Sequence, residues 1–322
     1  MEYTSLGATG LEVSRLCLGC ANYGSGDVPD DDWEWTVDAE QGHAVIDRAL
    51  EAGINFLDTA NYYSGGNSEE IVGEAIDGRR DEVVLATKVG ATMAERPNGD
   101  GLSRKHILEQ AAKSLDRLGT DYVDLYYAHS WDDDTPIEET LSAFDQLVRD
   151  GQVRYAGASN LAGWQLMKAL ATSDRRNFER LACVQSEYSL VAREEETQSL
   201  PAAADQGVGV TTYSPLAAGF LAGRYERGET PDPGSRLAPL WDRWNVEARW
   251  ETLGRVREVA DETGHTPVQV SVAWVLDREA VDSVIVGPED VDQLDEYLGA
   301  LEVSLSADQA DYLEAPMDRL RV

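Results

Sequence analysis

Short apolar segments alternate with amphipathic helical segments along the whole chain, and this alternation limits the fold more than any other feature. Runs of this length, bounded by turn residues, are typical of buried strands. Eight of them fall at residues 15–19, 54–58, 83–88, 122–129, 153–159, 182–186, 208–213 and 283–286. Eight such strands separated by helices predict an α/β fold in which a parallel sheet closes into a (β/α)8 TIM barrel, with residues 1–322 as one domain.

An open, doubly wound sheet is the alternative architecture for the same alternation. That fold usually carries a glycine-rich phosphate-binding turn between its first strand and the following helix. Gly24-Ser25-Gly26-Asp27 follows the first predicted strand but does not open a helix in the required way. The closed barrel is therefore favoured.

The helical segments carry recognisable start and stop signals. Ser103 is a predicted N-cap, and Thr135-Pro136-Ile137-Glu138 predicts a capping box with proline at the first helical position. The helix that begins there should end at Gly151. Further helices are predicted at 40–52, 68–76, 161–172, 194–206 and 267–277, and an extra C-terminal helix is expected beyond Val303.

The chain is strongly acidic, with 60 Asp and Glu against 27 Lys and Arg and a formal net charge of -33. Such a charge repels nucleic acid and anionic membranes, so neither is an expected partner. A hydrophobic content of 42% argues against disorder. We interpret the charge as an adaptation to molar (halophilic) salt, and equal stability and activity in dilute buffer would contradict that interpretation.

The sequence shows no run of eighteen apolar residues and no basic segment followed by an apolar one at its start. We therefore expect a cytoplasmic protein, and a monomer by default. Cys17 and Cys20 have the spacing of a redox motif, but residues three apart on a strand point to opposite faces. Two small buried residues are favoured over a redox pair. No cluster of metal ligands is visible.

Four residues of complementary chemistry fall at or just after the ends of three successive predicted strands. They are Asp58 and Tyr63, then Lys88, then His129. The carboxyl ends of the strands of a parallel barrel open onto the same face. A carboxylate, a phenol, an ammonium and an imidazole gathered on that face predict a proton-donating site.

The segment from Asn55 to Tyr63 resembles the signature of the aldo-keto reductase superfamily, in which Asp-Thr-Ala is followed two residues later by tyrosine. Further resemblances follow in the family's order: Leu6 to Ser14 (an N-terminal β-hairpin and first strand), Ser68-Glu69-Glu70-Ile71-Val72-Gly73, Thr87-Lys88, Asp124 to His129, Ala158-Ser159-Asn160 and Tyr213-Ser214-Pro215-Leu216. Ser64 departs from the pattern, because a glycine usually follows the family tyrosine. The resemblance implies an oxidoreductase that reduces a carbonyl with NAD(P)H.

The resemblance gives each of the four residues a role that physical chemistry supports. Tyr63 would be the general acid, and a nearby ammonium, Lys88, would lower the phenol pKa from about 10. Asp58 would orient Lys88, and His129 would donate a hydrogen bond to the carbonyl oxygen or share the proton. Each residue alone also has a structural interpretation, such as a strand-end cap, a rim aromatic or a core histidine. Tyr62 is the nearest competitor to Tyr63, and the family spacing selects Tyr63.

The resemblance also implies a set of cofactor-binding residues. Ser159, Asn160 and Gln185 would bind the nicotinamide carboxamide, and Tyr213 would stack on the ring. Ser214, Leu216 and Gly219 match the loop that covers the pyrophosphate, and Gly287 and Gln293 match positions near the adenosine phosphate.

The segment after the eighth strand departs from the family pattern. Family members commonly carry lysine or arginine there to pair with the 2′-phosphate of NADP, whereas residues 285–297 contain no basic residue and place Glu289 at a position where relatives often have arginine. A carboxylate repels a phosphate but can accept a hydrogen bond from a ribose hydroxyl. Arg236 could still reach the cofactor. The family pattern slightly favours NADP(H), and NAD(H) stays open.

Two long loops, at residues 21–36 and 217–247, should border the site and carry Trp33, Trp35, Trp241 and Trp244. Tyr23 and Trp131 are expected to line the substrate pocket. Aromatic walls with few polar groups suit an aldehyde, a ketone or a sugar-like carbonyl. The alternative function is a nicotinamide-binding regulatory subunit that resembles the potassium-channel β subunits, which share the fold and keep a reductase-like site.

Overall fold

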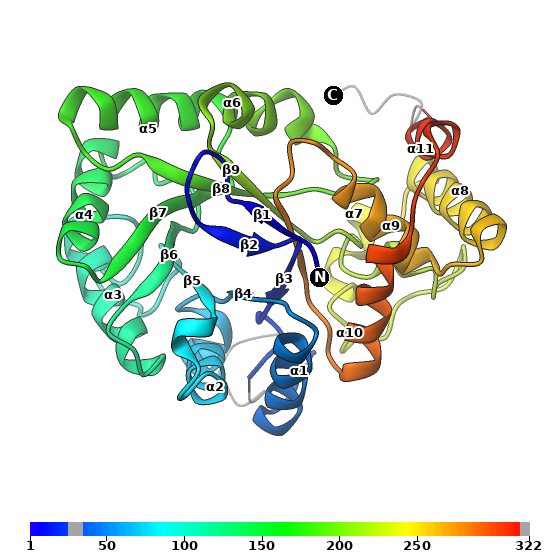
Figure 1. Ribbon diagram of the computed structural model, residues 1–322, viewed down its shortest axis with the longest axis horizontal. Helices are drawn as coiled ribbons and strands as arrows, with labels where there is room; N and C mark the ends of the chain where they lie inside the picture. The colour runs from blue at the N-terminus through cyan, green and yellow to red at the C-terminus, as the bar shows by residue number, and fades with distance from the viewer. Residues whose placement is uncertain (25–34, 316–322) are drawn as a thin grey trace.

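The computed structural model describes residues 1–24 and 35–315, and its centre is a closed barrel of eight parallel strands (Figure 1). The strands are β3 (Leu16–Gly19), β4 (Phe56–Asp58), β5 (Val84–Val89), β6 (Val123–Ala128), β7 (Val153–Ser159), β8 (Leu181–Glu187), β9 (Gly209–Tyr213) and β10 (Ser283–Val286). Each pairs with the next, and β10 closes the barrel against β3. The predicted (β/α)8 barrel is confirmed, and each predicted strand lies within two residues of an observed one.

Two hydrophobic layers hold the barrel together. Side chains that include Phe56, Leu125 and Tyr127 fill its interior. An N-terminal hairpin of β1 (Tyr3–Ser5) and β2 (Glu12–Ser14) lies across one end, where Leu6 and Val13 join that interior cluster (Figure 1). The larger core lies between the outer faces of the strands and the surrounding helices. Because the hairpin covers one end of the barrel, the barrel opens at the other end, where the carboxyl ends of the strands lie.

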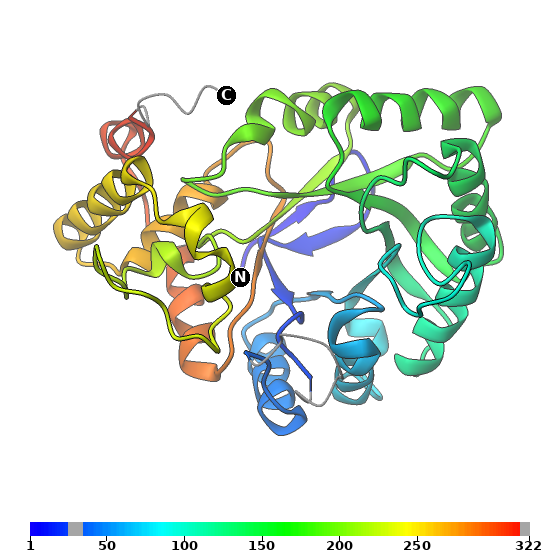
Figure 2. The same ribbon diagram turned by 180° about the vertical axis from the view of Figure 1, so that it is seen from behind.

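Helices surround the barrel, as Figures 1 and 2 show from opposite sides. They are α1 (Ala39–Glu51), α2 (Asn67–Ala75), α3 (Arg104–Arg117), α4 (Ile137–Arg149), α5 (Gly163–Arg176), α6 (Ser199–Gln206), α7 (Trp241–Trp244), α8 (Glu247–Thr263), α9 (Pro267–Leu276), α10 (Val291–Leu298) and α11 (Ala307–Glu314). Ser103 caps α3 as predicted, because its side chain accepts a hydrogen bond from the His106 amide. None of the described helices is long and apolar enough to cross a membrane.

The predicted capping box at the start of α4 is wrong. Pro136 occupies the N-cap position, and no side chain caps the helix. The carboxylate of Asp132 instead accepts hydrogen bonds from the amides of Asp134 (2.9 Å) and Thr135 (3.3 Å). This local turn uses the Thr135 backbone before the helix begins. The end of the helix is as predicted, with Gly151 in the left-handed conformation just beyond it (φ 76°).

The helix predicted at 194–206 is interrupted. A 3-10 helix, η3 (Glu194–Thr197), precedes α6, and Gln198 between them has non-helical angles (φ -123°, ψ -99°). Pro201 explains the break, because its ring would clash with the carbonyl four residues earlier in a continuous helix. The Glu195 carboxylate accepts a hydrogen bond from the Ser199 amide (3.1 Å) and so starts the second segment. α8 and α10 lie outside every predicted helix.

The three cysteines are buried and free. Cys17 belongs to the barrel interior and Cys20 to the outer core, so the two side chains do lie on opposite faces of β3 and its extension. Burial raises the pKa of both thiols above the usual range. They behave as small apolar residues, as predicted, and not as a redox pair.

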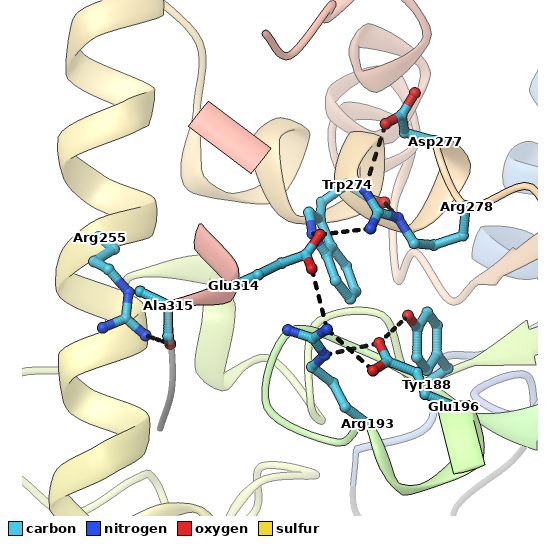
Figure 3. Close-up of polar contacts among 9 residues, drawn as sticks. All are labelled: Tyr188, Arg193, Glu196, Arg255, Trp274, Asp277, Arg278, Glu314 and Ala315. Carbon is cyan, nitrogen blue, oxygen red and sulfur yellow. Dashed lines mark hydrogen bonds and ion pairs between the residues drawn. The ribbon is translucent and has the colours of Figure 1, made fainter. Parts of the chain in front are cut away.

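The extra C-terminal helix, α11, is confirmed, and polar contacts at its end attach it to the barrel's helices (Figure 3). Glu314 accepts hydrogen bonds from Trp274 Nε1 (3.1 Å) and from Arg278 (2.5 Å) in and after α9. Its other oxygen accepts from Arg193 (3.2 Å), which also binds Glu196. Glu314 therefore joins α11, α9 and the segment after β8.

Replacing Glu314 by glutamine should lower the free energy of unfolding by about 1–3 kcal/mol, because two guanidinium groups lose their shared carboxylate. Burial raises the pKa of Glu314, but Arg278, the Trp274 hydrogen bond and Arg193 together lower it by more. The net pKa is therefore below the usual value of 4.5. The stabilisation is thus present above pH 4.5 and is lost as the pH falls below it. Urea unfolding at pH 7 and pH 4 would measure both effects. The exposed Glu302→Gln change is the control, and equal losses in the two variants would contradict this account.

Candidate active site

A cavity of about 840 Å³ opens at the carboxyl ends of the strands. It brings together most residues that the sequence analysis assigned to a site. Those that line it are Asp58, Tyr63, His129, Ser159, Asn160, Gln185, Tyr213, Ser214, Leu216, Gly219, Gly287, Glu289 and Gln293. Lys88 is fully buried just beneath them. The parallel barrel thus collects residues that are up to 235 positions apart in the sequence, from Asp58 to Gln293, around one space.

The four strand-end residues meet at the bottom of this cavity. Lys88 Nζ forms a buried ion pair with Asp58 and donates to the Thr59 carbonyl oxygen (2.9 Å). The same Nζ lies 3.2 Å from the Tyr63 hydroxyl oxygen. The ring of His129 lies 5.8 Å from the ring of Tyr63, edge to face. The constellation predicted from the sequence is therefore assembled in space.

A second layer of hydrogen bonds holds the backbone around this group. The hydroxyl groups of Thr59 and Ser68 lie 2.8 Å apart, and Ser68 donates to the Cys20 carbonyl oxygen (2.7 Å). Glu69 is fully buried and accepts a hydrogen bond from the side chain of Thr87 (2.5 Å), next to Lys88. These contacts tie the start of α2 to β5 and fix the turn between Asp58 and Tyr63.

The turn after Tyr63 has an unusual backbone. Ser64 (φ 47°), Gly65 (φ 64°) and Gly66 (φ 105°) are three consecutive residues in left-handed conformations, and Ser64 is the one that bears a side chain. That side chain is buried against the Gly24 backbone, where an added Cβ would lie 2.0 Å from Ser64 Oγ. The serine that departs from the family pattern is therefore accommodated because residue 24 is a glycine.

Replacing Gly24 by alanine should lower the free energy of unfolding by about 1–3 kcal/mol, because the new methyl group overlaps Ser64. In a Ser64→Gly background most of that loss should disappear, since the overlapping atoms are gone. Urea unfolding of the wild type, both single variants and the double variant would measure this coupling. An equal cost of Gly24→Ala in both backgrounds would show that Ser64 is not what requires the glycine.

Burial changes the protonation of this group. Burial lowers the pKa of Lys88, but the contacts with Asp58 and Tyr63 raise it by more. The net pKa of Lys88 therefore lies above the usual range. Burial raises the pKa of Tyr63 and outweighs the opposing effect of Lys88. Lys88 therefore lowers the pKa of Tyr63 as expected, but burial keeps the net pKa above its ordinary value. Burial, and then the charge of Lys88, lower the pKa of His129 to about 3.

A chain of hydrogen bonds crosses the next part of the cavity. Tyr213 donates from its hydroxyl to Asn160 Oδ1 (2.7 Å), and Asn160 Nδ2 donates to the His129 carbonyl oxygen (2.9 Å). Gln185 Nε2 donates to Asp58 Oδ1 (2.9 Å). The buried Ser159 hydroxyl has no hydrogen-bond partner among the described residues. An unsatisfied buried hydroxyl beside two amides suits a ligand that carries an amide of its own.

Charged groups of both signs line the cavity. Arg224 and Arg236 come from the segment after β9, and Glu289 and Glu296 come from the segment after β10. Arg236 is stacked over Trp35 at 5.0 Å and lies close to Gly287. Sequence reasoning noted Arg236 but missed Arg224, for which the only signal was a basic residue in the loop after the seventh strand.

The structure corrects both predicted substrate-pocket residues. Tyr23 is fully buried in the outer core and does not line the cavity. Trp131 lines a separate, small apolar pocket, and its ring packs edge-on against Trp164 at 5.7 Å.

Of the three other loop tryptophans that the structure describes, one borders the cavity. Trp35 lines it, whereas Trp241 and Trp244 are buried in the outer core. Trp33 lies outside the described residues. Among the described residues no group of three or more His, Cys, Asp or Glu side chains could hold a metal ion.

Comparison with known proteins agrees with this geometry. The sequence profile of the Aldo/keto reductase family matches residues 15–317. An uncharacterized oxidoreductase of Bacillus subtilis (strain 168), YrpG, is 39% identical over 95% of this chain and 92% of its own length. Versiconal hemiacetal acetate reductase of Aspergillus parasiticus is 36% identical over 98% and 97%. A probable voltage-gated potassium channel subunit beta of Arabidopsis thaliana is 36% identical over 94% and 92%. This chain therefore belongs to the Aldo/keto reductase family of oxidoreductases.

Proposed function

We propose that this chain is an NAD(P)H-dependent carbonyl reductase that converts an aldehyde, a ketone or a sugar-like carbonyl to an alcohol. The observation that carries the proposal is the contact of Lys88 Nζ with both Asp58 and the Tyr63 hydroxyl at the bottom of the cavity. A phenol held against a buried ammonium is a proton donor whose conjugate base is stabilised where it forms.

Reduction of a carbonyl by hydride leaves an alkoxide that needs a proton. A bound nicotinamide cofactor would supply the hydride. Tyr63 donates its proton to the oxygen, and Lys88 stabilises the phenolate that results. Asp58 holds Lys88 in place. His129 is neutral near pH 7, because its pKa is about 3, so it acts as a hydrogen-bond donor to the carbonyl oxygen and not as the source of the proton.

The cavity fits a nicotinamide dinucleotide. At the end nearest Tyr63, the unpartnered Ser159 hydroxyl, Asn160 and Gln185 would hold the carboxamide, and Tyr213 would stack on the ring. The loop with Ser214, Leu216 and Gly219 would cover the pyrophosphate. Arg224 and Arg236 offer the positive charge that phosphate groups require. Gly287, Glu289 and Gln293 would border the adenosine end.

The direct test follows the absorbance of the reduced cofactor with the purified full chain and a panel of aldehydes, ketones and sugars in molar KCl. We expect consumption of NADPH or NADH that depends on the carbonyl, with one alcohol formed per reduced cofactor oxidised. Cofactor binding without consumption for any carbonyl would contradict the reductase proposal.

A regulatory subunit is the second candidate, because two relatives from plants carry the name probable voltage-gated potassium channel subunit beta and are 36% and 35% identical to this chain. That function predicts tight retention of the cofactor, slow turnover and a stable protein partner. Multiple turnovers of the free chain at a constant rate would argue against it.

Glu289 is expected to decide the choice of cofactor. Its backbone amide and carboxylate both contact Gln293, and the two residues line the cavity together with Arg224 and Arg236. We propose that NADPH is accepted slightly better than NADH, with Arg224 and Arg236 offsetting the repulsion by Glu289. Glu289→Arg should raise the ratio of kcat/KM for NADPH over NADH by about 5- to 30-fold, the equivalent of one or two kcal/mol. Glu262→Arg, an exposed change of equal charge, is the control, and equal shifts would contradict a local effect.

A further inference from the structure

A hydrogen bond between Gln185 and Asp58 crosses the mouth of the barrel. Around the closed sheet the strands follow the order β10, β3, β4, β5, β6, β7, β8, β9, so β4 and β8 lie on opposite sides. Gln185 at the end of β8 nevertheless donates from Nε2 to Asp58 Oδ1 at the end of β4, at 2.9 Å. Both residues are 3% exposed. The bond is buried, and it joins the residue that holds Lys88 to the opposite wall of the cavity.

The hydrogen bonds of Asp58 are divided between two partners. One carboxylate oxygen pairs with Lys88 and the other accepts from Gln185. Because Lys88 in turn contacts the Tyr63 hydroxyl, three consecutive contacts connect Gln185 to the proton donor. A change in the strength or direction of the Gln185–Asp58 hydrogen bond would therefore alter the contact between Lys88 and Tyr63.

Gln185 also has unused hydrogen-bonding capacity on the cavity side. Its Oε1 has no partner among the described residues, and one N–H remains after the bond to Asp58. Gln185 is paired in register with Ser159, and its carbonyl accepts from the Asn160 amide (2.9 Å). Its side chain thus sits beside the two other residues proposed to hold the carboxamide.

We propose that Gln185 is a positioning residue that couples binding of the nicotinamide carboxamide to the Asp58–Lys88–Tyr63 group. A hydrogen bond donated by the carboxamide NH2 group to Gln185 Oε1 would polarise the side-chain amide and strengthen its N–H bond to Asp58. The occupied site then holds Asp58, and with it Lys88, more firmly than the empty site. This inference rests on the proposed reductase function, but it assigns to Gln185 a second effect beyond cofactor affinity.

A double-mutant cycle on kcat separates the two effects. Gln185→Met keeps the size of the side chain and removes its donors, so kcat at saturating cofactor should fall at least about tenfold, in line with the loss of a hydrogen bond to a charged group. In an Asp58→Asn background the same change should lower kcat less than about twofold, because the route through the carboxylate is already broken. Multiplicative losses in the two backgrounds, or a change in cofactor Kd alone, would overturn the inference.

The small number of lysines provides a readout that does not depend on activity. Lysine labelled with 13C should give four Cε signals, from Lys88, Lys105, Lys113 and Lys168, and Lys88→Met assigns the first. Added NADP+ or NAD+ should move the Lys88 signal in the wild type, and this shift should be lost in Gln185→Met at a saturating cofactor concentration. An equal shift in both proteins overturns the coupling, even if no carbonyl is ever reduced. A wild type that shows the coupling but reduces nothing would count against the reductase proposal alone.

Discussion

Tyr63→Phe should lower kcat/KM for carbonyl reduction by about 10²- to 10⁴-fold, the range for removal of a general acid. The variant keeps the ring that packs against Tyr62 at 5.0 Å and His129 at 5.8 Å, so the cavity should keep its shape. What it loses is the hydroxyl 3.2 Å from Lys88 Nζ, which is the proposed proton donor. Initial rates of NADPH and NADH oxidation with the best aldehyde would measure the effect.

Tyr62→Phe is the matched control for this experiment. Tyr62 is the adjacent phenol and its ring lies 5.2 Å from His129, but Lys88 contacts the hydroxyl of Tyr63. We expect less than a tenfold loss for Tyr62→Phe, and a cofactor Kd close to that of the wild type for Tyr63→Phe. A full loss in Tyr62→Phe with retention in Tyr63→Phe would reverse the assignment of the acid.

The barrel was predictable because its strands are covered on both faces. Segment 283–286 is a continuous run of small and apolar residues, and it matches β10 end to end. Segment 153–159 also matches its strand, β7, end to end, and its last four residues are small and buried. The helix signals were less reliable. α8 begins within a predicted loop, and its inward-facing residues, such as Arg249 and Trp250, do not form a simple apolar stripe. The break before α6 depends on Pro201, which a pattern of apolar residues does not register.

The sequence predicts the site residues that lie at strand ends better than those that lie in loops. Asp58 and Lys88 are the last or next-to-last residues of their strands, and the parallel barrel fixes where strand ends meet. Tyr23 and Trp131 follow their strands by several residues in loops, where the direction of a side chain depends on the turn and not on strand periodicity. The Gln185–Asp58 hydrogen bond also could not be predicted from the sequence, because it depends on the diameter of the closed barrel.

Lys88→Met should remove both activity and stability. Lys88 is fully buried, and its loss leaves the Asp58 carboxylate without its cation, which costs about 3–5 kcal/mol for a buried pair. Activity should fall at least about 10²-fold, because the phenolate of Tyr63 would form without a nearby positive charge.

The stabilising effect of Lys88 depends on pH. Burial lowers the pKa of Lys88, but Asp58 and Tyr63 raise it by more, so its net pKa is above 10.5. Its stabilising effect is therefore fully present below pH 10.5 and is lost as the pH rises through the folded-state pKa.

The double variant Lys88→Met with Asp58→Asn distinguishes the two effects of the lysine. Removing both charges removes the unpaired carboxylate, so urea unfolding should show much of the lost stability restored. Activity should stay as low as in Lys88→Met, because no ammonium faces Tyr63. Recovery of activity together with stability would mean that Lys88 acts only through the fold, and Tyr63 would then need another source of stabilisation for its phenolate.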